Sequence, residues 1–313
     1  MDKTKILIAG IGGVGGYFGG LLAQKYYNND QIEVYFLARG KHLKKIQEKG
    51  LRVIIGAKDF IARPKIASDD PNAFGTMDHI IVCTKSYGLE ETIEMLKPCI
   101  DDKTVILPLL NGVDSRERIT AMLPYNLVLE GCVYIISRLT QAGTVENLGN
   151  IQKLFFGLDN FENEKLTELQ EIFLSAGIEA TLSTNISSII WEKYIFISSV
   201  ATATSYYDTT IGAILADRKK MKILSDLITE VSEVAKAKKM AVSEDIAPKT
   251  LNKIKSLPYE MTSSMHSDFQ NKNHRTELRS LTNYVVKEGC KLGIKIPTYH
   301  KLYIELEAVV TNF

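Results

Sequence analysis

Short apolar segments alternate with helical patterns along the first third of the chain. Each apolar segment is followed by polar or glycine-containing sequence, and the four segments cover residues 5–9, 32–38, 79–84 and 104–110. Continuous apolar strands of this length are typical of a parallel sheet covered by helices on both faces. We therefore predict an α/β fold with a parallel sheet for the N-terminal part, with a helix over residues 17–27 after the first strand.

The middle of the chain is richer in β-strand patterns. Residues 51–67 predict a small hairpin, and the β-rich residues 127–157 could extend the sheet with antiparallel strands. Residues 163–177 predict a helix that ends at Gly177, because glycine commonly terminates helices. The strand Ile178–Leu182 is expected to follow.

The character of the sequence changes after about residue 184. Eighteen of the 21 glycines lie in residues 1–177, and apolar residues recur at helical spacing in 218–240, 280–291 and 299–310. We therefore predict an all-α C-terminal domain over residues 185–313, after an α/β domain over residues 1–184. A chain of 313 residues is long enough for two domains of ordinary size.

Composition excludes several functional classes. The chain carries 38 Lys and Arg against 37 Asp and Glu, so it has no basic excess of the kind that nucleic-acid binding requires. The uncharged segment Ile6–Ala23 contains seven glycines, which weaken a helix, so we predict neither a membrane span nor a signal peptide. The four cysteines are widely spaced and no metal-ligand spacing occurs, which favours a cytoplasmic protein without disulfides or a bound metal.

A glycine-rich turn follows the first strand and leads into the first helix. Gly10, Gly12 and Gly15 match the spacing G-x-G-x-x-G, with Gly13 and Val14 between them. The first glycine permits a tight turn, the second lets a pyrophosphate approach the backbone, and the third lets the helix pack on the strand. We predict a dinucleotide site here; a glycine-rich turn without a ligand is the alternative.

The end of the second strand selects between the two nicotinamide cofactors. An NAD site usually has an acidic residue there, which binds the ribose hydroxyls, but this chain has Arg39. A guanidinium group suits the 2′-phosphate of NADP(H), because it offers charge-assisted and often bidentate hydrogen bonds. We therefore predict NADP(H) as the cofactor, with a solvated surface arginine as the alternative.

Several further motifs form an ordered set along the whole chain. They are Thr84-Lys85-Ser86-Tyr87, Asn111-Gly112-Val113, Trp191-Glu192-Lys193, Ser263-Ser264-Met265-His266-Ser267-Asp268 and Arg275-Thr276-Glu277. With the glycine-rich turn, this series resembles the ketopantoate reductase (2-dehydropantoate 2-reductase) family. The resemblance implies a Rossmann-type N-terminal domain, a helical C-terminal domain and a substrate cleft between them. It also implies hydride transfer from NADPH to the ketone of a 2-oxo acid. It also favours a homodimer.

The resemblance also assigns roles to individual residues. Lys193 would protonate the developing alkoxide, and Glu277 would bind substrate and help to hold Lys193. Ser264 would bind the substrate carboxylate, and Asn111 would lie beside the nicotinamide and the substrate. Lys85 would contact the cofactor ribose or the substrate carboxylate. Each residue type also has an ordinary role, as a solvated lysine, a surface carboxylate, a helix cap or a turn residue.

One position departs from the family pattern. Members that make pantoate usually carry asparagine four residues after the catalytic lysine, where this chain has Ile197. An apolar residue there weakens the case for a substrate with a hydroxyl group, because such a hydroxyl needs a partner. His266 and His274 flank the predicted active site, although we expect both of them on the surface.

Three hypotheses follow for the function. The first is NADPH-dependent reduction of 2-dehydropantoate (ketopantoate) to pantoate in pantothenate biosynthesis. The second is a reductase of a different 2-oxo or 2-hydroxy acid within the same family. The third is a non-catalytic protein that binds NADP as a sensor.

Overall fold

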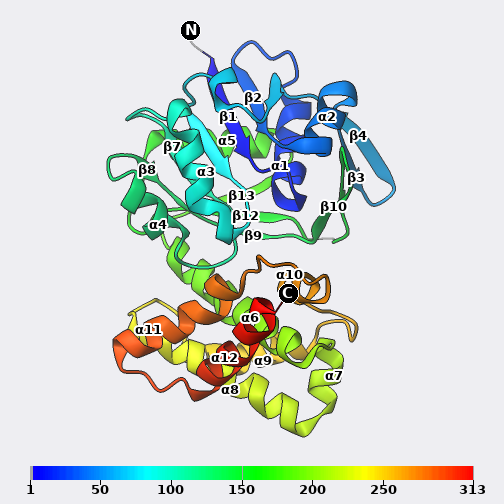
Figure 1. Cartoon of the computed structure of the whole chain (residues 1–313). Coiled ribbons are helices and arrows are strands. Elements are labelled where there is room, and N and C mark those ends of the chain that lie inside the picture. The colour runs from blue at the N-terminus through cyan, green and yellow to red at the C-terminus, as the bar shows by residue number, and fades with distance from the viewer. Residues whose placement is uncertain (1–2, 150, 313) are drawn as a thin grey trace. The chain divides into compact units, whose positions relative to one another are not determined.

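The computed structural model describes residues 3–149 and 151–312 and forms two compact units (Figure 1). The first, here called the α/β unit, comprises residues 1–110 and 114–186. The second, the helical unit, comprises residues 111–113 and 187–313. The sequence prediction divided the chain at residue 184, whereas the compact units divide after Ile186 and segment 111–113 joins the second unit.

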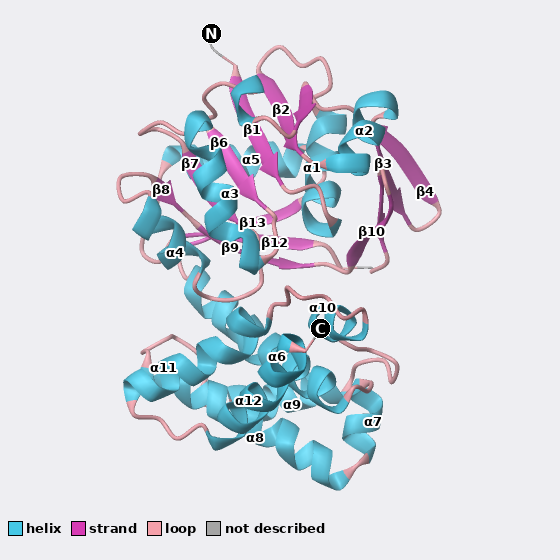
Figure 2. Cartoon of the chain, in the orientation of Figure 1, coloured by secondary structure: helices cyan, strands magenta, loops and turns pink. Residues whose placement is uncertain are grey.

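A six-stranded parallel sheet forms the centre of the α/β unit (Figure 2). Its order is β5-β2-β1-β6-β7-β8, and every neighbouring pair is parallel. The strands are β1 (Thr4–Ala9), β2 (Ile32–Leu37), β5 (Ile66–Ser68), β6 (His79–Val82), β7 (Val105–Pro108) and β8 (Leu127–Val128). The chain starts in the middle and builds outward on both sides, so the strand order reverses between β1 and β6, as in Rossmann folds. The predicted fold class is confirmed.

Helices cover both faces of this sheet. In β1, Ile6 and Ile8 belong to one apolar cluster while Leu7 and Ala9 belong to another, because successive side chains of a strand point to opposite faces. The first cluster includes side chains of α1 (Gly13–Lys25), α2 (Gly40–Lys49) and α5 (Glu164–Ser175). The second includes side chains of α3 (Leu89–Leu96) and α4 (Ser115–Met122). Single 3₁₀ turns lie at η1 (Pro71–Ala73), η2 (Ser86–Gly88) and η3 (Lys97–Cys99).

Two smaller sheets complete the α/β unit. The first has the order β10-β11-β3-β4 and contains β3 (Leu51–Ile55), β4 (Lys58–Ala62), β10 (Ser137–Gln141) and β11 (Thr144–Asn147). The second has the order β13-β12-β9 and contains β9 (Glu130–Tyr134), β12 (Lys153–Gly157) and β13 (Glu179–Ser183). The β3–β4 hairpin confirms the prediction for residues 51–67.

The prediction that residues 127–157 extend the main sheet with antiparallel strands is wrong. Among the residues of this range that the structure describes, only β8 joins that sheet, and it does so in parallel. The reason lies in α1, where a Cβ on Gly16 or Gly20 would come within 2.5 Å of Val145 in β11 or Val53 in β3. These helical glycines let a second sheet pack closely against α1.

The helical unit is built around the long helix α6 (Ile186–Tyr207). Its other α-helices are α7 (Ile211–Ala216), α8 (Arg218–Ala237), α9 (Ile246–Lys255), α10 (Ser264–Gln270), α11 (Tyr284–Leu292) and α12 (Pro297–Thr311). A π-helical turn, η4 (Arg279–Asn283), precedes α11 where the sequence predicts regular helix. Trp191 and Tyr194 of α6 pack edge to face at 5.5 Å inside its apolar core. Among the residues that the structure describes, no helix is both long and apolar enough to span a membrane.

Candidate active site

The glycine-rich turn lies where the strand order of the main sheet reverses. Gly10 follows β1 with a φ of +99°, which residues with a side chain rarely adopt. A Cβ there would lie 3.0 Å from Thr84 Cγ2 and 3.1 Å from the Thr84 backbone nitrogen, just beyond β6. The ends of β1 and β6 therefore approach each other closely at the edge where open α/β sheets bind ligands.

Two glycines of this turn are required by packing within the chain. A Cβ on Gly15 would collide with the Gly10 carbonyl oxygen and lie 2.8 Å from Cys83 Cβ. A Cβ on Gly13 would collide with the carbonyl oxygen of Ser137 in β10. These two positions exclude a side chain whether or not a nucleotide binds. Val14 lies between them and packs against the core.

Gly12 differs from its neighbours because none of the described residues excludes a side chain there. A Cβ on Gly12 would meet no atom of those residues within 4 Å. Gly12 is the N-cap of α1, and neither a side-chain cap nor an acidic residue satisfies the first turn of that helix. Free N–H groups and the helix dipole favour a phosphate at such an end. The open space at Gly12 therefore fits the close approach of a pyrophosphate.

The predicted cofactor-selecting residue, Arg39, lies two residues after β2 as the N-cap of α2. Its side chain is 58% exposed, and Nη1 lies 3.8 Å from Glu91 Oε1 of α3. A long, exposed ion pair of this kind contributes little free energy, so a phosphate could displace it. Lys85 lies three residues after β6, as the N-cap of the turn η2, and is half-buried.

In the helical unit, Lys193 and Asn111 lie together although 82 residues separate them. Lys193 is half-buried on α6, and its Nζ donates a hydrogen bond to Asn111 Oδ1 at 3.0 Å. Asn111 is in this unit because segment 111–113 belongs to it and Val113 packs against the helical core. An amide oxygen that accepts one ammonium proton orients the others.

Ser264 and Glu277 form a second pair in the helical unit. Glu277 is only 2% exposed, whereas Ser264 is exposed at the first position of α10. The Ser264 hydroxyl donates a long hydrogen bond, 3.5 Å, to Glu277 Oε2. The helix cap is Ser263 and not Ser264, so capping does not account for a serine at position 264.

The residues that follow Lys193 on α6 place few polar groups on the face of the helix that carries the lysine. Ile197 lies one turn beyond Lys193 and packs against the helical core while remaining partly exposed. Ser198, Ser199 and Thr202 are fully buried. Their hydroxyl groups are used inside the unit by the carbonyl oxygens of Leu281 and Ile195 and the hydroxyl of Thr282.

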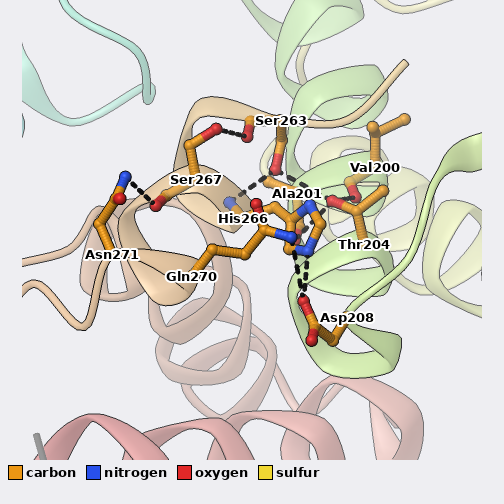
Figure 3. Close-up of polar contacts among 9 residues, drawn as sticks. All are labelled: Val200, Ala201, Thr204, Asp208, Ser263, His266, Ser267, Gln270 and Asn271. Carbon is orange, nitrogen blue, oxygen red and sulfur yellow. Dashed lines mark hydrogen bonds and ion pairs between the residues drawn. The ribbon is translucent and has the colours of Figure 1, made fainter. Parts of the chain in front are cut away.

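The expectation that His266 lies on the surface is wrong. His266 is buried, with 2% of its surface exposed, and its Nε2 lies 2.7 Å from Asp208 Oδ1 (Figure 3). His274, in contrast, is exposed as predicted. The sequence contained no signal for the Asp208–His266 contact, because 58 residues separate the two and neither lies in a helical or strand pattern with the other.

A cavity of about 620 Å³ lies away from these residues, near the amino ends of β1 and β2. Its lining includes Lys3, Lys65 and Glu33, and none of the predicted site residues. Hydrogen bonds from the Tyr35 hydroxyl and from the two lysines lower the pKa of Glu33 to about 2. Lys3 and Lys65 are therefore already paired with a carboxylate of the chain.

These features define a class of protein. A parallel sheet in Rossmann order, with a glycine cradle at its reversal point, belongs to dinucleotide-binding proteins. The all-helical unit that follows adds a half-buried lysine held by an asparagine and a buried glutamate paired with a serine. The combination is that of a two-domain, nicotinamide-dependent oxidoreductase.

Comparison with known proteins identifies the family. Residues 6–160 match the family described as "Ketopantoate reductase PanE/ApbA", and residues 185–310 match "Ketopantoate reductase PanE/ApbA C terminal". The chain belongs to the ketopantoate reductase family, and the resemblance drawn from its motifs is confirmed. It is an oxidoreductase of this NAD(P)-dependent family.

Three relatives illustrate the range of this likeness. The chain is 36% identical to a 2-dehydropantoate 2-reductase from Porphyromonas gingivalis W83, with a TM-score of 0.85 over 97% of this chain and 99% of that one. It is 30% identical over 304 residues to the "Uncharacterized oxidoreductase YkpB" of Bacillus subtilis, covering 97% and 98% of the two chains. It also shares its fold with a D-mandelate dehydrogenase solved with NADH and anilino(oxo)acetate, at 24% identity, a TM-score of 0.84 and 99% coverage of both chains.

Proposed function

We propose that this protein reduces the ketone of a 2-oxo acid with NADPH, and that 2-dehydropantoate is the first candidate substrate, reduced to pantoate for pantothenate biosynthesis. The observation that carries the proposal is the 3.0 Å hydrogen bond from Lys193 Nζ to Asn111 Oδ1. The relative from Porphyromonas gingivalis, named for this reaction, supports the choice of substrate.

The cofactor residues proposed in the α/β unit are those of the turn and the strand ends. They are Gly10, Gly12, Gly13, Val14, Gly15, Arg39 and Lys85, and Asn111 of the helical unit joins them. The open space at Gly12 supports a pyrophosphate, and the weakly paired guanidinium of Arg39 supports the 2′-phosphate that distinguishes NADPH from NADH. Bound NADPH would supply the hydride that adds to C2 of the acid.

The catalytic residue in this proposal is Lys193. Its ammonium group would donate a proton from Nζ to the ketone oxygen while C2 receives the hydride, so that the product is a neutral hydroxyl group. The charge of Lys193 would also stabilise the oxygen as negative charge develops on it. Asn111 Oδ1 accepts a different proton of the same ammonium group and fixes the direction of the donated one.

The remaining proposed residues bind the acid. Ser264 is exposed, and its hydroxyl would turn from its long bond to Glu277 and donate its one proton to the substrate carboxylate. Glu277, beside it, would then accept a hydrogen bond from the substrate and help to hold Lys193. Lys85 is a further candidate for the carboxylate, because a cation suits an anionic group.

Ile197 favours a second candidate substrate. A partly exposed isoleucine one turn beyond Lys193, with the neighbouring hydroxyl groups used inside the unit, offers no partner to a substrate hydroxyl. Such a surface suits a 2-oxo acid with a hydrocarbon side chain, and the fold relative named for D-mandelate is consistent with this chemistry. A homodimer and a cytoplasmic location remain predictions from the sequence.

NADPH oxidation with a panel of acids tests the proposal. We expect turnover with 2-dehydropantoate or with phenylglyoxylate, the 2-oxo acid that corresponds to mandelate. Preference for the first supports the pantoate reaction, and preference for the second supports the apolar alternative. Tight NADPH binding without turnover of any 2-oxo acid would instead support a non-catalytic sensor and contradict the proposal.

A further inference from the structure

We propose that His266 and Asp208 form a latch that positions Ser264 for the substrate carboxylate. This His266–Asp208 latch joins α10 to the residue directly after α6 (Figure 3). Ser264 lies two residues before His266, so any movement of α10 moves the hydroxyl that faces Glu277. The inference rests on the function proposed above, which assigns the carboxylate to Ser264.

The geometry of His266 explains why a histidine occupies a buried position. Its side chain is 3% exposed, and Nε2 lies 2.7 Å from Asp208 Oδ1. Because a carboxylate only accepts hydrogen bonds, Nε2 carries the proton. Within the described residues the other ring nitrogen, Nδ1, is buried without a hydrogen-bond partner, which disfavours a polar ring here. The contact with Asp208 is therefore what accounts for the imidazole.

Asp208 occupies its position at a local cost. Its φ of +45° lies in the left-handed region that favours glycine. It also follows the last residue of α6, where the helix dipole disfavours a negative charge. Its side chain is 75% exposed, so burial does not hold it there. An aspartate with two local disadvantages is explained by the hydrogen bond that it accepts from His266.

A second attachment fixes the beginning of α10. The His266 backbone N–H donates to Ser263 Oγ at 3.0 Å, and Ser263 Oγ lies 3.0 Å from Thr204 Oγ1. Thr204 in turn donates to the Val200 carbonyl at 2.8 Å. Because that bond uses the only hydroxyl proton of Thr204, Ser263 donates to Thr204. The chain of bonds runs in one direction from α10 into α6.

Ser264 lies between these two attachments. Ser263 holds one side of it to Thr204, and His266 holds the other to Asp208 (Figure 3). Thr204 belongs to the last turn of α6, the helix that also carries Lys193, and Asp208 directly follows that helix. The latch therefore ties the proposed carboxylate-binding hydroxyl to the same rigid helix as the proposed proton donor.

The test compares two amide side chains in place of His266, of which only the longer one can bring its nitrogen to Asp208. The amide nitrogen of His266→Gln can lie near the place of Nε2, whereas that of His266→Asn cannot. We expect His266→Asn to raise KM for the best 2-oxo acid about tenfold or more while kcat changes less than about threefold. His266→Gln should keep KM near the wild-type value.

His300→Asn, at an exposed position of α12, is the matched control and should leave KM unchanged. In a Ser264→Ala background, His266→Asn should have no further effect on KM, because the latch acts through Ser264.

Two results would overturn the latch. One is an equal effect of His266→Asn with and without Ser264, and the other is a His266→Gln variant as impaired as His266→Asn. Amide hydrogen exchange of residues 263–270 in the free protein provides a readout without turnover, and His266→Asn should accelerate exchange there. If the wild type reduces no 2-oxo acid, the proposed function fails, and unchanged exchange in His266→Asn would then refute the latch by itself.

Discussion

Alanine substitutions at Gly12 and Gly15 should separate nucleotide binding from packing. Both glycines belong to the same turn, but a Cβ on Gly12 would meet no atom of residues 3–149 and 151–312 within 4 Å. A Cβ on Gly15 would collide with the Gly10 carbonyl oxygen and lie 2.8 Å from Cys83 Cβ, which is about 0.6 Å inside the 3.4 Å of ordinary contact. Gly12→Ala should therefore impair only ligand binding, and Gly15→Ala should impair folding.

The magnitudes follow from these contacts. Crowding of this kind costs about 1–3 kcal/mol, and in a domain of this size each kcal/mol shifts the melting temperature by about 2–4 °C. Gly15→Ala should thus lower Tm by about 2–12 °C. Gly12→Ala should leave Tm nearly unchanged but keep a phosphate from the backbone N–H groups. Hydrogen bonds to a charged group contribute about 1.5–3 kcal/mol each, so Kd for NADPH should rise about tenfold or more.

Thermal unfolding and calorimetric titration with NADPH measure the two effects. Gly88→Ala is the matched control. A Cβ on Gly88 also enters open space, the φ of Gly88 is −108°, and Gly88 lies outside the glycine-rich turn of residues 10–15. This variant should keep the wild-type Tm. Wild-type affinity for NADPH in Gly12→Ala would refute the assignment of the open space to a pyrophosphate. A fall in Tm for Gly12→Ala as large as that for Gly15→Ala would refute the packing argument.

Three further predictions address charge and polarity. Arg39→Ala should raise Kd for NADPH about tenfold or more and leave Kd for NADH unchanged, and equal affinities of the wild type for both cofactors would contradict the role of Arg39. NMR titration should give Glu33 a pKa of about 2, and Tyr35→Phe should raise it. Since the pKa of Glu33 is lower in the folded protein, its stabilisation is complete above the unfolded pKa near 4.3 and is lost as pH falls towards about 2. A measured Glu33 pKa near 4.3 would contradict this prediction. Thr202→Val should destabilise the helical unit by about 1–3 kcal/mol in denaturant unfolding, because it leaves the Thr282 hydroxyl unpaired. The double variant that also carries Thr282→Val should recover part of this lost stability, because neither hydroxyl is then left unpaired.

The main sheet could be predicted from the sequence because its strands are continuous apolar runs. Their alternation with helices predicted the parallel arrangement, and the resemblance to a family added the Rossmann class. The first helix was predicted to begin at Tyr17, but it begins at Gly13. Three glycines, at positions 13, 15 and 16, conceal its first turn, and packing against β10 and β11 outweighs their poor helix propensity. Pairings such as β11 with β3 join residues about 90 positions apart, and no local pattern specifies them.

In the proposed site, too, some residues have a local sequence signal and others do not. The turn at Gly10–Gly15 and the end of β2 carry a local signal, because the chemistry of a phosphate constrains adjacent residues. The residues of the helical unit were found only through the resemblance to a family. The bond between Lys193 and Asn111 depends on segment 111–113 belonging to the second unit, which follows from tertiary packing. Asp208 was missed because its partner, His266, lies 58 positions further along the chain and no local pattern links the two.

The central claim is that Lys193 donates the proton in the reduction of a 2-oxo acid, and Lys193→Ala tests it most directly. The rate of NADPH oxidation at saturating acid should be measured together with Kd for NADPH. We expect kcat to fall about 10²–10⁴-fold, as for the loss of a general acid, while Kd for NADPH stays within about twofold of the wild type. A Lys193→Ala variant that reduces its best acid within about threefold of the wild-type rate would contradict the account.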